Sequence, residues 1–558
     1  MKDFSKEIRA YALKNAIDFG KADSGKMLPK LFQHGLDKKD IKNVMPSIIQ
    51  ICKEVNSLSK SNQQKEFEKL KSLVKEREEK ERVLPELNNI SKNMVFRLAP
   101  YPSGALHLGN TKTYLLNALY AEKYKAKILF VMDDTIGSEE KKLVPEAYAL
   151  LEEAFQWLSV KYEKPVIYKS DRLEIYYEYG EKLIEKNKAY VCKCPQETLR
   201  ENRIKGLECS CRKLPLDEQK KRWKEMPSLQ KGEAVLRLKT DMKHQNPAFR
   251  DRVLFKISDR PHPRVGTKYK VWPTLEMSWA VDDHLLSITH ILRGNDLMIE
   301  TDMEKYIWDV FNWKHPETIH AGMVRIEGMG AKLSKSKAQK EVLSGEFIGW
   351  DDPRTWSIQS LRRRGIRAEA IRAFIEEIGL NKQDIIIPIE ALYAHNRKLI
   401  DLESNRFSFV QDPIEVLVSS APKVPEIEIP VHPDRRSETR KITLGKKIFI
   451  SNEDVQNLKG KEIRLLHLFN IDLGKNETKG AIAAKYTSTE NKPITKINWV
   501  SNGIKARILM PDGKWIEGLA EEAISKLKVG EIIQFERNFF CRFDRKHEGI
   551  YEFWFAHK

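Results

Sequence analysis

Two short stretches of the sequence carry side chains that could bind and activate a triphosphate. The first ends with His107, Leu108, Gly109 and Asn110, and the second contains Lys332, Ser334 and Lys335. Glycine lets a phosphate group approach the backbone closely, and imidazole, amide and ammonium groups can donate hydrogen bonds to its oxygens. Two ammonium groups in one loop suit a reaction in which negative charge grows on a triphosphate. The pattern indicates phosphate chemistry shared between two distant segments.

The first stretch is predicted to be a strand, a turn and the start of a helix. Residues 94–99 form a short apolar run typical of a buried strand, and Pro100, Pro102 and Gly104 interrupt it before a helix resumes near Thr111. The N–H groups and the macrodipole at a helix N-terminus favour an anion. Each feature alone is also typical of an ordinary surface turn. Only their combination indicates a nucleotide site.

The two stretches together resemble the signatures of class I aminoacyl-tRNA synthetases. Residues 97–110 (the first signature) are similar to the form used by glutamyl- and glutaminyl-tRNA synthetases, and residues 330–336 (the second signature) to the Lys-Met-Ser-Lys-Ser loop. The resemblance implies that ATP, accompanied by Mg²⁺, contacts Tyr101, Pro102, Ser103, Gly104, His107, Leu108, Gly109, Asn110, Lys332, Ser334 and Lys335. It implies catalytic roles for His107, Asn110, Lys332 and Lys335. Asn110 replaces the second His of the signature, and an amide can still donate to a phosphate oxygen.

Three charged residues are candidates for binding an amino acid. Asp133 follows an apolar strand run, and Arg293 ends another, where parallel strands meet the ligand crevice. A buried arginine needs an anionic partner, and its planar fork suits a carboxylate. The resemblance implies that Asp133 holds the α-amino group, that Arg97 is a second cationic contact and that Arg293 binds the γ-carboxylate. Two arginines and one aspartate complement glutamate, which favours glutamate over glutamine.

Four of the six cysteines form two close pairs, Cys192 with Cys194 and Cys209 with Cys211. Two such pairs supply the four thiolates of a structural tetrahedral Zn²⁺ site, although reduced free thiols are the alternative. The resemblance agrees, since several glutamyl-tRNA synthetases bear zinc in the domain that binds the acceptor end of tRNA. The run Asp282, Asp283 and His284 is interpreted as structural rather than metal-binding, because no second cluster completes a site.

Length and charge limit the class of protein. A chain of 558 residues is too long for one core, and its formal net charge of +18 indicates a polyanionic partner. Basicity alone does not separate nucleic acid from an anionic membrane. No apolar run approaches the roughly 20 residues of a membrane span, and the N-terminus lacks the apolar core of a signal peptide. We therefore expect a cytosolic protein without membrane association.

The coarse pattern along the chain predicts a multidomain α/β protein. A helical N-terminal extension is expected over residues 1–90, and residues 280–286 and 288–296 are predicted to continue the sheet. The resemblance implies a Rossmann-like catalytic domain at 91–191 and 280–340, an inserted acceptor-end-binding domain at 192–279 and a helical stem-contact region at 341–412. From about Lys441 the chain shows period-two alternation, which predicts short β-strands. The resemblance implies anticodon-binding β-barrels over residues 413–558, in which bases could be gripped and stacked by Arg464, Arg507, Arg537 and Arg542 with Phe539 and Phe540.

The sequence is identified as resembling archaeal-type glutamyl-tRNA synthetases over nearly its whole length. This resemblance implies a glutamate–tRNA ligase that forms glutamyl-adenylate from ATP and glutamate and transfers glutamate to tRNA(Glu). It leaves open whether tRNA(Gln) is also a substrate, and we expect a monomer. The alternatives are a glutaminyl-tRNA synthetase, a non-catalytic tRNA-binding paralogue suggested by Asn110, and a cofactor-forming nucleotidyl transferase, against which the long basic C-terminal region argues.

Overall fold

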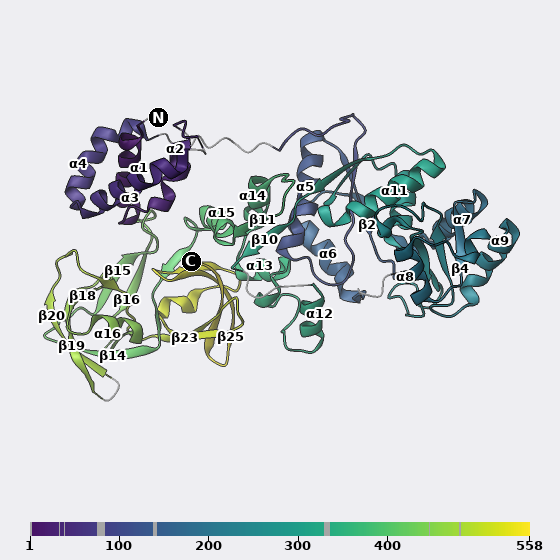
Figure 1. The fold of residues 1–558 in the computed structure, drawn as a ribbon. Helices are drawn as coiled ribbons and strands as arrows, with labels where there is room; N and C mark the ends of the chain where they lie inside the picture. Colours follow the sequence, from purple (N-terminus) through teal and green to yellow (C-terminus); the bar gives the residue numbers. More distant parts are fainter. Residues whose placement is uncertain are drawn as a thin grey trace. The chain divides into compact units, whose positions relative to one another are not determined.

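The computed structural model describes residues 3–32, 34–37, 40–74, 84–137, 142–328, 335–445, 447–478 and 481–558. Figure 1 shows the fold, which divides into two compact units, residues 1–82 and 83–558. In these ranges no helix combines the length and apolarity that a membrane crossing needs.

The first unit is a small helical bundle of α1 (Ser5–Phe19), α2 (Leu28–Phe32), α3 (Ile41–Ser57) and α4 (Lys60–Leu70). Ile8, Leu13, Ile48 and Val55 are almost fully buried in its core. Ile48, Cys52 and Val55 lie at helical spacing on α3, so one face of that helix is apolar. The bundle therefore has a core of its own.

The second unit begins with a parallel sheet. Strands β1 (Val95–Leu98), β2 (Lys127–Met132) and β3 (Glu163–Tyr168) pair in the order β1-β2-β3. Helix α5 (Leu108–Tyr124) connects β1 to β2, and α6 (Pro145–Trp157) precedes β3. Strands β8 (His290–Gly294) and β9 (Glu317–Ala321) form a second parallel pair, and the N–H of Thr289 donates to the carbonyl of Val95 beside it.

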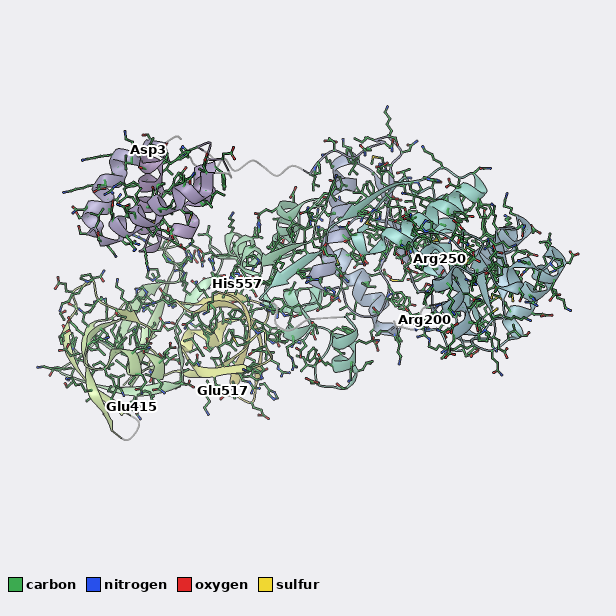
Figure 2. All side chains as sticks on the ribbon, viewed as in Figure 1. Asp3, Arg200, Arg250, Glu415, Glu517 and His557 are labelled. Carbon is green, nitrogen blue, oxygen red and sulfur yellow. The ribbon has the colours of Figure 1, made fainter. Side chains whose placement is uncertain are left out.

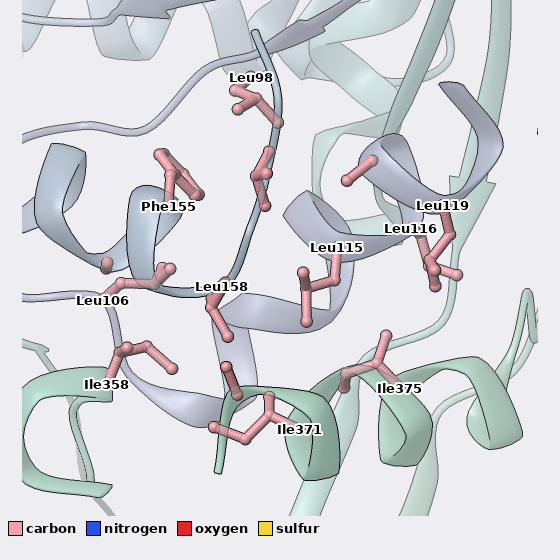
Figure 3. Close-up of a cluster of buried hydrophobic side chains, with 14 of the residues drawn as sticks. Leu98, Leu106, Leu115, Leu116, Leu119, Phe155, Leu158, Ile358, Ile371 and Ile375 are labelled. Atoms are coloured by element: carbon pink, nitrogen blue, oxygen red, sulfur yellow. The ribbon is translucent and has the colours of Figure 1, made fainter. Parts of the chain in front are cut away.

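The core of this sheet lies between α5 and the helices around it. Figure 3 shows Leu115 and Leu116 of α5 near Ile371 and Ile375 of α14 (Ala368–Ile378) and Phe155 of α6. These side chains are almost fully buried, which contributes roughly 1.5–3 kcal/mol for each one. Burial fixes α5, and with it the turn that precedes α5.

An antiparallel subdomain is inserted between the two halves of the parallel sheet. Its strands β4 (Ala189–Cys192), β5 (Val235–Leu238), β6 (Val253–Ile257) and β7 (Val271–Pro273) pair in sequence order, with α7 (Leu173–Glu185), α8 (Gln196–Lys205) and α9 (Leu216–Glu225) beside them. Arg250, labelled in Figure 2, donates to the carbonyls of Arg203 and Ile204 at the C-terminal end of α8. Those carbonyls have no partner within the helix, so the arginine closes its end.

The prediction of a strand at residues 280–286 is wrong, because this segment belongs to helix α10 (Leu275–Leu285). A short apolar run is equally typical of a buried strand and of a helix buried on several sides. Met277, Trp279, Ala280 and Val281 are all buried here. The helix leads through β8 to α11 (Met298–Phe311).

The segment after β9 joins the parallel sheet to the C-terminal region. Strand β10 (Val324–Glu327) pairs in parallel with β11 (Ile385–Pro388). The helices of this region are α12 (Lys335–Leu343), α13 (Ile358–Arg364), α14 and α15 (Glu390–Ile400). Arg364 is fully buried and donates to the carbonyls of Phe555 and Ala556, which fastens α13 to the last strand of the chain.

Two barrel-like sheets form the C-terminal region. The seven-stranded sheet has the order β12-β24-β25-β26-β22-β23-β13 and the six-stranded sheet the order β17-β14-β20-β19-β18-β21. Their strands are β12 (Asn405–Phe407), β13 (Phe409–Gln411), β14 (Pro413–Ser419), β17 (Ile448–Ser451), β18 (Glu462–Leu465), β19 (Asn470–Thr478), β20 (Ala481–Ser488), β21 (Lys496–Ile497), β22 (Ile504–Leu509), β23 (Trp515–Ala520), β24 (Ile532–Phe535), β25 (Phe539–His547) and β26 (Ile550–His557). The hairpin of β15 (Glu426–Pro430) and β16 (Thr439–Thr443) and helix α16 (Asn452–Leu458) complete the region.

The expected stacking of bases on Phe539 and Phe540 is wrong. Both side chains are buried, with 8% and 1% of their surface exposed. Consecutive strand residues point to opposite faces of a sheet, and here both faces are covered. These phenylalanines therefore build the core of the sheet and its contact with α15.

Candidate active site

A cavity of about 960 Å³ lies at the carboxyl ends of the parallel strands. Its wall includes Ala99 after β1, Asp133 after β2, Arg293 near the end of β8 and Gly322 after β9. This edge of a parallel sheet is where side chains from several strands converge on a ligand. The inserted subdomain supplies further charged groups, including Arg252 and Lys256 of the β6 region.

The first signature forms the turn between β1 and α5. His107 has extended backbone angles at the N-cap of α5, and its carbonyl accepts from the N–H of Asn110 at 3.0 Å. The neighbouring chain holds this turn, because the N–H of Leu108 donates to the carbonyl of Trp356 and that of Ile358 to the carbonyl of Leu106. Of the residues predicted to contact ATP, Tyr101, Ser103, His107, Gly109 and Asn110 line the cavity.

Gly104 is required by the shape of the turn. Its φ of +148° lies in a region that favours glycine, and a Cβ atom there would lie 2.3 Å from the ring of Trp350. Gly104, Pro102 and Leu108 are buried and do not line the cavity. Their part in the turn is to shape the backbone that carries His107.

The second signature falls largely outside the described residues. Lys332 and Ser334 are not described, and Lys335 is described only in its backbone, as the first residue of α12. Strand β10, which precedes this segment, begins with Val324 in the cavity wall. The roles assigned to these three residues remain predictions.

Arg97 and Asp133 meet at a tryptophan that the sequence analysis did not single out. The Arg97 guanidinium lies 3.6 Å from the ring centroid of Trp279, whose Nε1–H donates to Asp133 at 3.1 Å. Lys169, with no exposed surface, has its Nζ 3.3 Å from Asp133 and 3.4 Å from the same ring centroid. The indole therefore fixes both predicted amino-acid contacts relative to each other.

Arg293 lies in the cavity wall with a carboxylate partner of its own. Its Nη1 and Nη2 donate to Glu304 at 2.8 and 3.1 Å, and Nη1 also donates to Thr301. Burial raises the pKa of Glu304 to about 7, and the Arg293 guanidinium acts in the opposite direction. Arg293 Nε is buried without a hydrogen-bond partner in the described part of the chain.

The charge argument for glutamate is incomplete, because each predicted contact already has a counter-ion. Arg97 pairs with Asp283, Arg293 with Glu304 and Asp133 with Lys169. Asp283 and Glu304 come from the helices α10 and α11. The sequence did hold a signal for these ion pairs, because Asp283 and Glu304 occur among apolar residues. An acidic side chain is rarely buried unless it is paired.

Comparison with known families matches three models along the chain. Residues 93–402 match the catalytic domain of the class I tRNA synthetases (E and Q), and residues 404–488 and 496–544 match two anticodon-binding domains of that group. The chain belongs to the class I tRNA synthetases of the E and Q group. The fold class expected from the sequence is thereby confirmed.

The synthetase is similar to curated archaeal proteins over its whole length. It is 39% identical to the glutamate–tRNA ligase of Methanocaldococcus jannaschii, over 99% of this chain and 100% of the relative. It is 40% identical to the glutamate–tRNA ligase of Pyrococcus furiosus, over 98% of each chain. A crystal structure of glutamate-tRNA synthetase from Elizabethkingia anophelis matches with a TM-score of 0.42 and 20% identity, over 56% of this chain and 72% of that one, which is too weak to carry an argument.

The four cysteines of the synthetase's inserted subdomain come together as predicted. The Sγ atoms of Cys192, Cys194, Cys209 and Cys211 all lie within 4.8 Å of one another. Sγ–Sγ distances are 3.6 Å for Cys192 with Cys209 and 3.9 Å for Cys194 with Cys211. Four thiolates around Zn²⁺ at about 2.3 Å would be separated by about 3.8 Å, so the cluster fits the ion. Nη1 of Arg222 lies 3.5 Å from Cys211 Sγ and offsets part of the negative charge that such a cluster would carry.

The acidic run in helix α10 has a structural use. Asp282 accepts from Arg172 at 2.8 Å and from the hydroxyl of Tyr176 at 2.6 Å, whereas Asp283 accepts from Arg97. The ring of His284 stacks on Trp313, with 4.0 Å between the ring centroids. Three neighbouring residues thus contact four different partners.

Proposed function

We propose that this synthetase is a glutamate–tRNA ligase. The glutamate α-carboxylate attacks the α-phosphorus of ATP, which forms glutamyl-adenylate and releases pyrophosphate. A ribose hydroxyl at the 3′ end of tRNA then attacks the acyl carbon, which forms glutamyl-tRNA and releases AMP. The observation that carries the proposal is the single cavity that brings Arg97, Asp133 and Arg293 to the first signature. Full-length relatives that are named glutamate–tRNA ligases support it.

In the first step the protein contributes mainly positioning and charge. The attacking carboxylate is ionised at pH 7 and needs no general base, so rate comes from orientation and from stabilising the charge on the leaving pyrophosphate. His107, Gly109 and Asn110 would hold phosphates, and Lys332 and Lys335 would stabilise the transition state. ATP would bring Mg²⁺, which neutralises phosphate charge when bound.

For glutamate we assign the three contacts expected from the sequence, and we take into account the ion pairs that each of them already makes. Asp133 would receive the α-ammonium group, and Arg97 would face a carboxylate from above the indole of Trp279. Arg293 would offer Nε–H to the γ-carboxylate, since its Nη groups are engaged by Glu304 and Thr301. Glutamine would leave this donor with a weaker, neutral acceptor.

We further propose that Cys192, Cys194, Cys209 and Cys211 hold a structural Zn²⁺. Four thiolates form a closed shell without an open position for catalysis. The ion would fasten β4 to the loop that carries Cys209 and Cys211 in the inserted subdomain, which would bind the acceptor end of tRNA. The matched anticodon-binding domains and the formal charge of +18 support tRNA as the partner. A monomer remains a prediction of the sequence.

The test is aminoacylation with radiolabelled glutamate and, separately, glutamine on purified tRNA(Glu) and tRNA(Gln). Charging of tRNA(Glu) alone with glutamate is expected of a discriminating ligase, and charging of both tRNAs of a non-discriminating one. Incorporation of glutamine would contradict the assignment of Arg293, and the absence of any charging would favour a tRNA-binding paralogue. Lys335→Ala should abolish most of the activity, whereas Lys340→Ala, an exposed lysine of the same helix α12, should not.

A further inference from the structure

Lys112 is a buried lysine in the wall of the active-site cavity. It lies on α5 five residues after His107, and only 2% of its surface is exposed. Its Nζ donates to the carbonyl of Gly322 at 2.7 Å and to the side-chain oxygen of Asn381. Helix α5 is thus fastened to two segments that are distant in the sequence.

Both acceptors of Lys112 belong to one locally cross-linked structure. The N–H of Gly322 donates to the carbonyl of Asn381, that of Met323 to Asp384, and that of Ile385 to the carbonyl of Met323. These bonds tie residues 322–323, between β9 and β10, to residues 381–385, which lead into the start of β11. A Cβ on Gly322 would lie 2.0 Å from the carbonyl oxygen of Gln383, so the two segments are in close contact.

The cross-linked segment forms the cavity wall that faces the first signature. Ala321, Gly322, Met323 and Val324 line the same cavity as His107, Gly109 and Asn110. A Cβ on Gly109 would lie 3.8 Å from the carbonyl oxygen of Val324, so the start of α5 and the start of β10 are neighbours. Lys112 bridges these two walls.

The contacts of Lys112 differ from those of Arg97 and Arg293, the two buried arginines of the cavity wall. Arg97 and Arg293 are each held by a carboxylate, whereas no carboxylate lies within ion-pair distance of Lys112 in the described ranges. Burial lowers the pKa of Lys112 to about 8, which is the cost of keeping an ammonium group here. Burying an ammonium group is costly unless its donors are satisfied. Here the acceptors are the carbonyl of Gly322, which lines the cavity, and the side chain of Asn381, whose backbone carbonyl accepts from Gly322.

We propose that Lys112 is a positioning residue that sets the distance between the first signature and the β9–β10 wall and so shapes the ATP part of the cavity. Its ammonium group reaches from the second turn of α5 to two acceptors outside that helix, of which Gly322 lies in the β9–β10 wall. Removing it leaves the Gly322 carbonyl without its donor and releases the wall from α5. A displacement of about 1 Å between groups that orient reactants can lower a rate by about 100-fold.

The experiment compares aminoacylation kinetics of Lys112→Met, Asn381→Leu and the double variant in the full chain. Lys112→Met should lower kcat by about tenfold or more and raise the KM for ATP by about fivefold, with the KM values for glutamate and tRNA changed by less than about twofold. Asn381→Leu should act in the same direction. The double variant should be no worse than Lys112→Met, because both changes break the same bridge.

Lys123→Met is the matched control. Lys123 lies on the same helix and also donates to a backbone carbonyl, that of Leu84, but neither residue lines the cavity. This variant should leave the KM for ATP unchanged. Asn381→Asp separates geometry from charge, because it keeps an acceptor for Lys112 but adds a negative charge that balances the ammonium group. If Asn381→Asp changes kcat and the KM for ATP less than Asn381→Leu does, the positioning role is supported. An equal or larger change would overturn the proposal.

A direct readout of the bridge is hydrogen–deuterium exchange in peptides that span residues 319–328. Exchange there should be faster in Lys112→Met than in the wild type, even if the variant is only partly active. Unchanged exchange, or equal changes in the KM values for ATP and glutamate, would overturn the proposal. The inference rests on the proposed ligase activity, and a wild-type enzyme that charges no tRNA would contradict that activity rather than the bridge, which exchange tests separately.

Discussion

Asp283 accepts hydrogen bonds from Nε and Nη2 of Arg97 at 2.5 and 3.0 Å, and both residues are buried. The pair joins strand β1 to helix α10, and Trp279 of the same helix lies beneath the guanidinium. The orientation of Arg97 in the cavity is therefore fixed before a substrate arrives, which avoids the cost of ordering it on binding.

Asp283→Asn should leave Arg97 buried without a carboxylate partner. Breaking a buried ion pair by removing one partner costs about 3–5 kcal/mol of stability. The Arg97 guanidinium would also lose the contact that fixes its orientation in the cavity. We expect the KM for glutamate to rise by about tenfold and the KM for ATP to change little. Steady-state aminoacylation measures both, and an unchanged KM for glutamate would contradict a positioning role for Asp283.

Trp279→Phe should keep the ring beside Arg97 but remove the Nε1–H bond to Asp133. A lost hydrogen bond to a charged group costs about 1.5–3 kcal/mol, so kcat/KM for glutamate should fall by about 10- to 100-fold. Trp308→Phe is the control, because Trp308 Nε1–H donates to the carbonyl of Ala280 and does not line the cavity. Equal losses in the two variants would indicate general destabilisation.

Arg293→Cys should lower kcat/KM for glutamate by about 100-fold or more, because the γ-carboxylate loses its cationic partner. The single variant also leaves Glu304 buried without the guanidinium that lowers its pKa, so the pKa rises further and the fold becomes less stable as the pH increases from 4.5. The double variant Arg293→Cys with Glu304→Gln should recover thermal stability but not the use of glutamate. Recovery of both would show that Arg293 acts only through folding.

Purified protein should contain about one Zn²⁺ per chain by elemental analysis. Cys192→Ser should lose the ion and should make residues 189–273 more sensitive to protease, because metal binding contributes folding energy to a small subdomain. Cys52→Ser is the control, since Cys52 lies in the first unit and should leave the zinc content unchanged. Full zinc content in Cys192→Ser would contradict the assignment of Cys192 as a zinc ligand.

His557 should make the protein less stable in acid. Its Nε2 accepts from Asn396, and burial lowers its pKa to about 4 from 6.5. The folded chain therefore binds this proton more weakly than the unfolded chain, so stability is complete above about pH 6.5 and falls by about 3 kcal/mol toward pH 4.

Denaturant unfolding at pH 7 and pH 5 measures the acid effect of His557. His557→Gln should flatten the pH dependence relative to the wild type, whereas substitution of the exposed His547 by Gln should not. An identical pH dependence in His557→Gln and wild type would exclude His557 as its source.

Several features could be predicted from the sequence because they depend on local spacing. The strand, turn and helix around His107 follow from an apolar run broken by proline and glycine, and the two cysteine pairs follow from their separation. The β-rich C-terminal region follows from its period-two alternation. In each case the chemistry lies within a few residues of chain, where periodicity and turn residues decide the structure.

By itself the sequence determined the signatures, the candidate residues Arg97, Asp133 and Arg293, and the class of substrate they indicate. Only the tertiary structure decided which groups neutralise them, because Asp283, Lys169 and Glu304 lie on different elements from the residues they pair with. It also made residues 280–286 a helix rather than a strand, since a short apolar run fits either element until its neighbours are known. Burial and ion pairing depend on distances between elements, and local spacing carries no record of those distances.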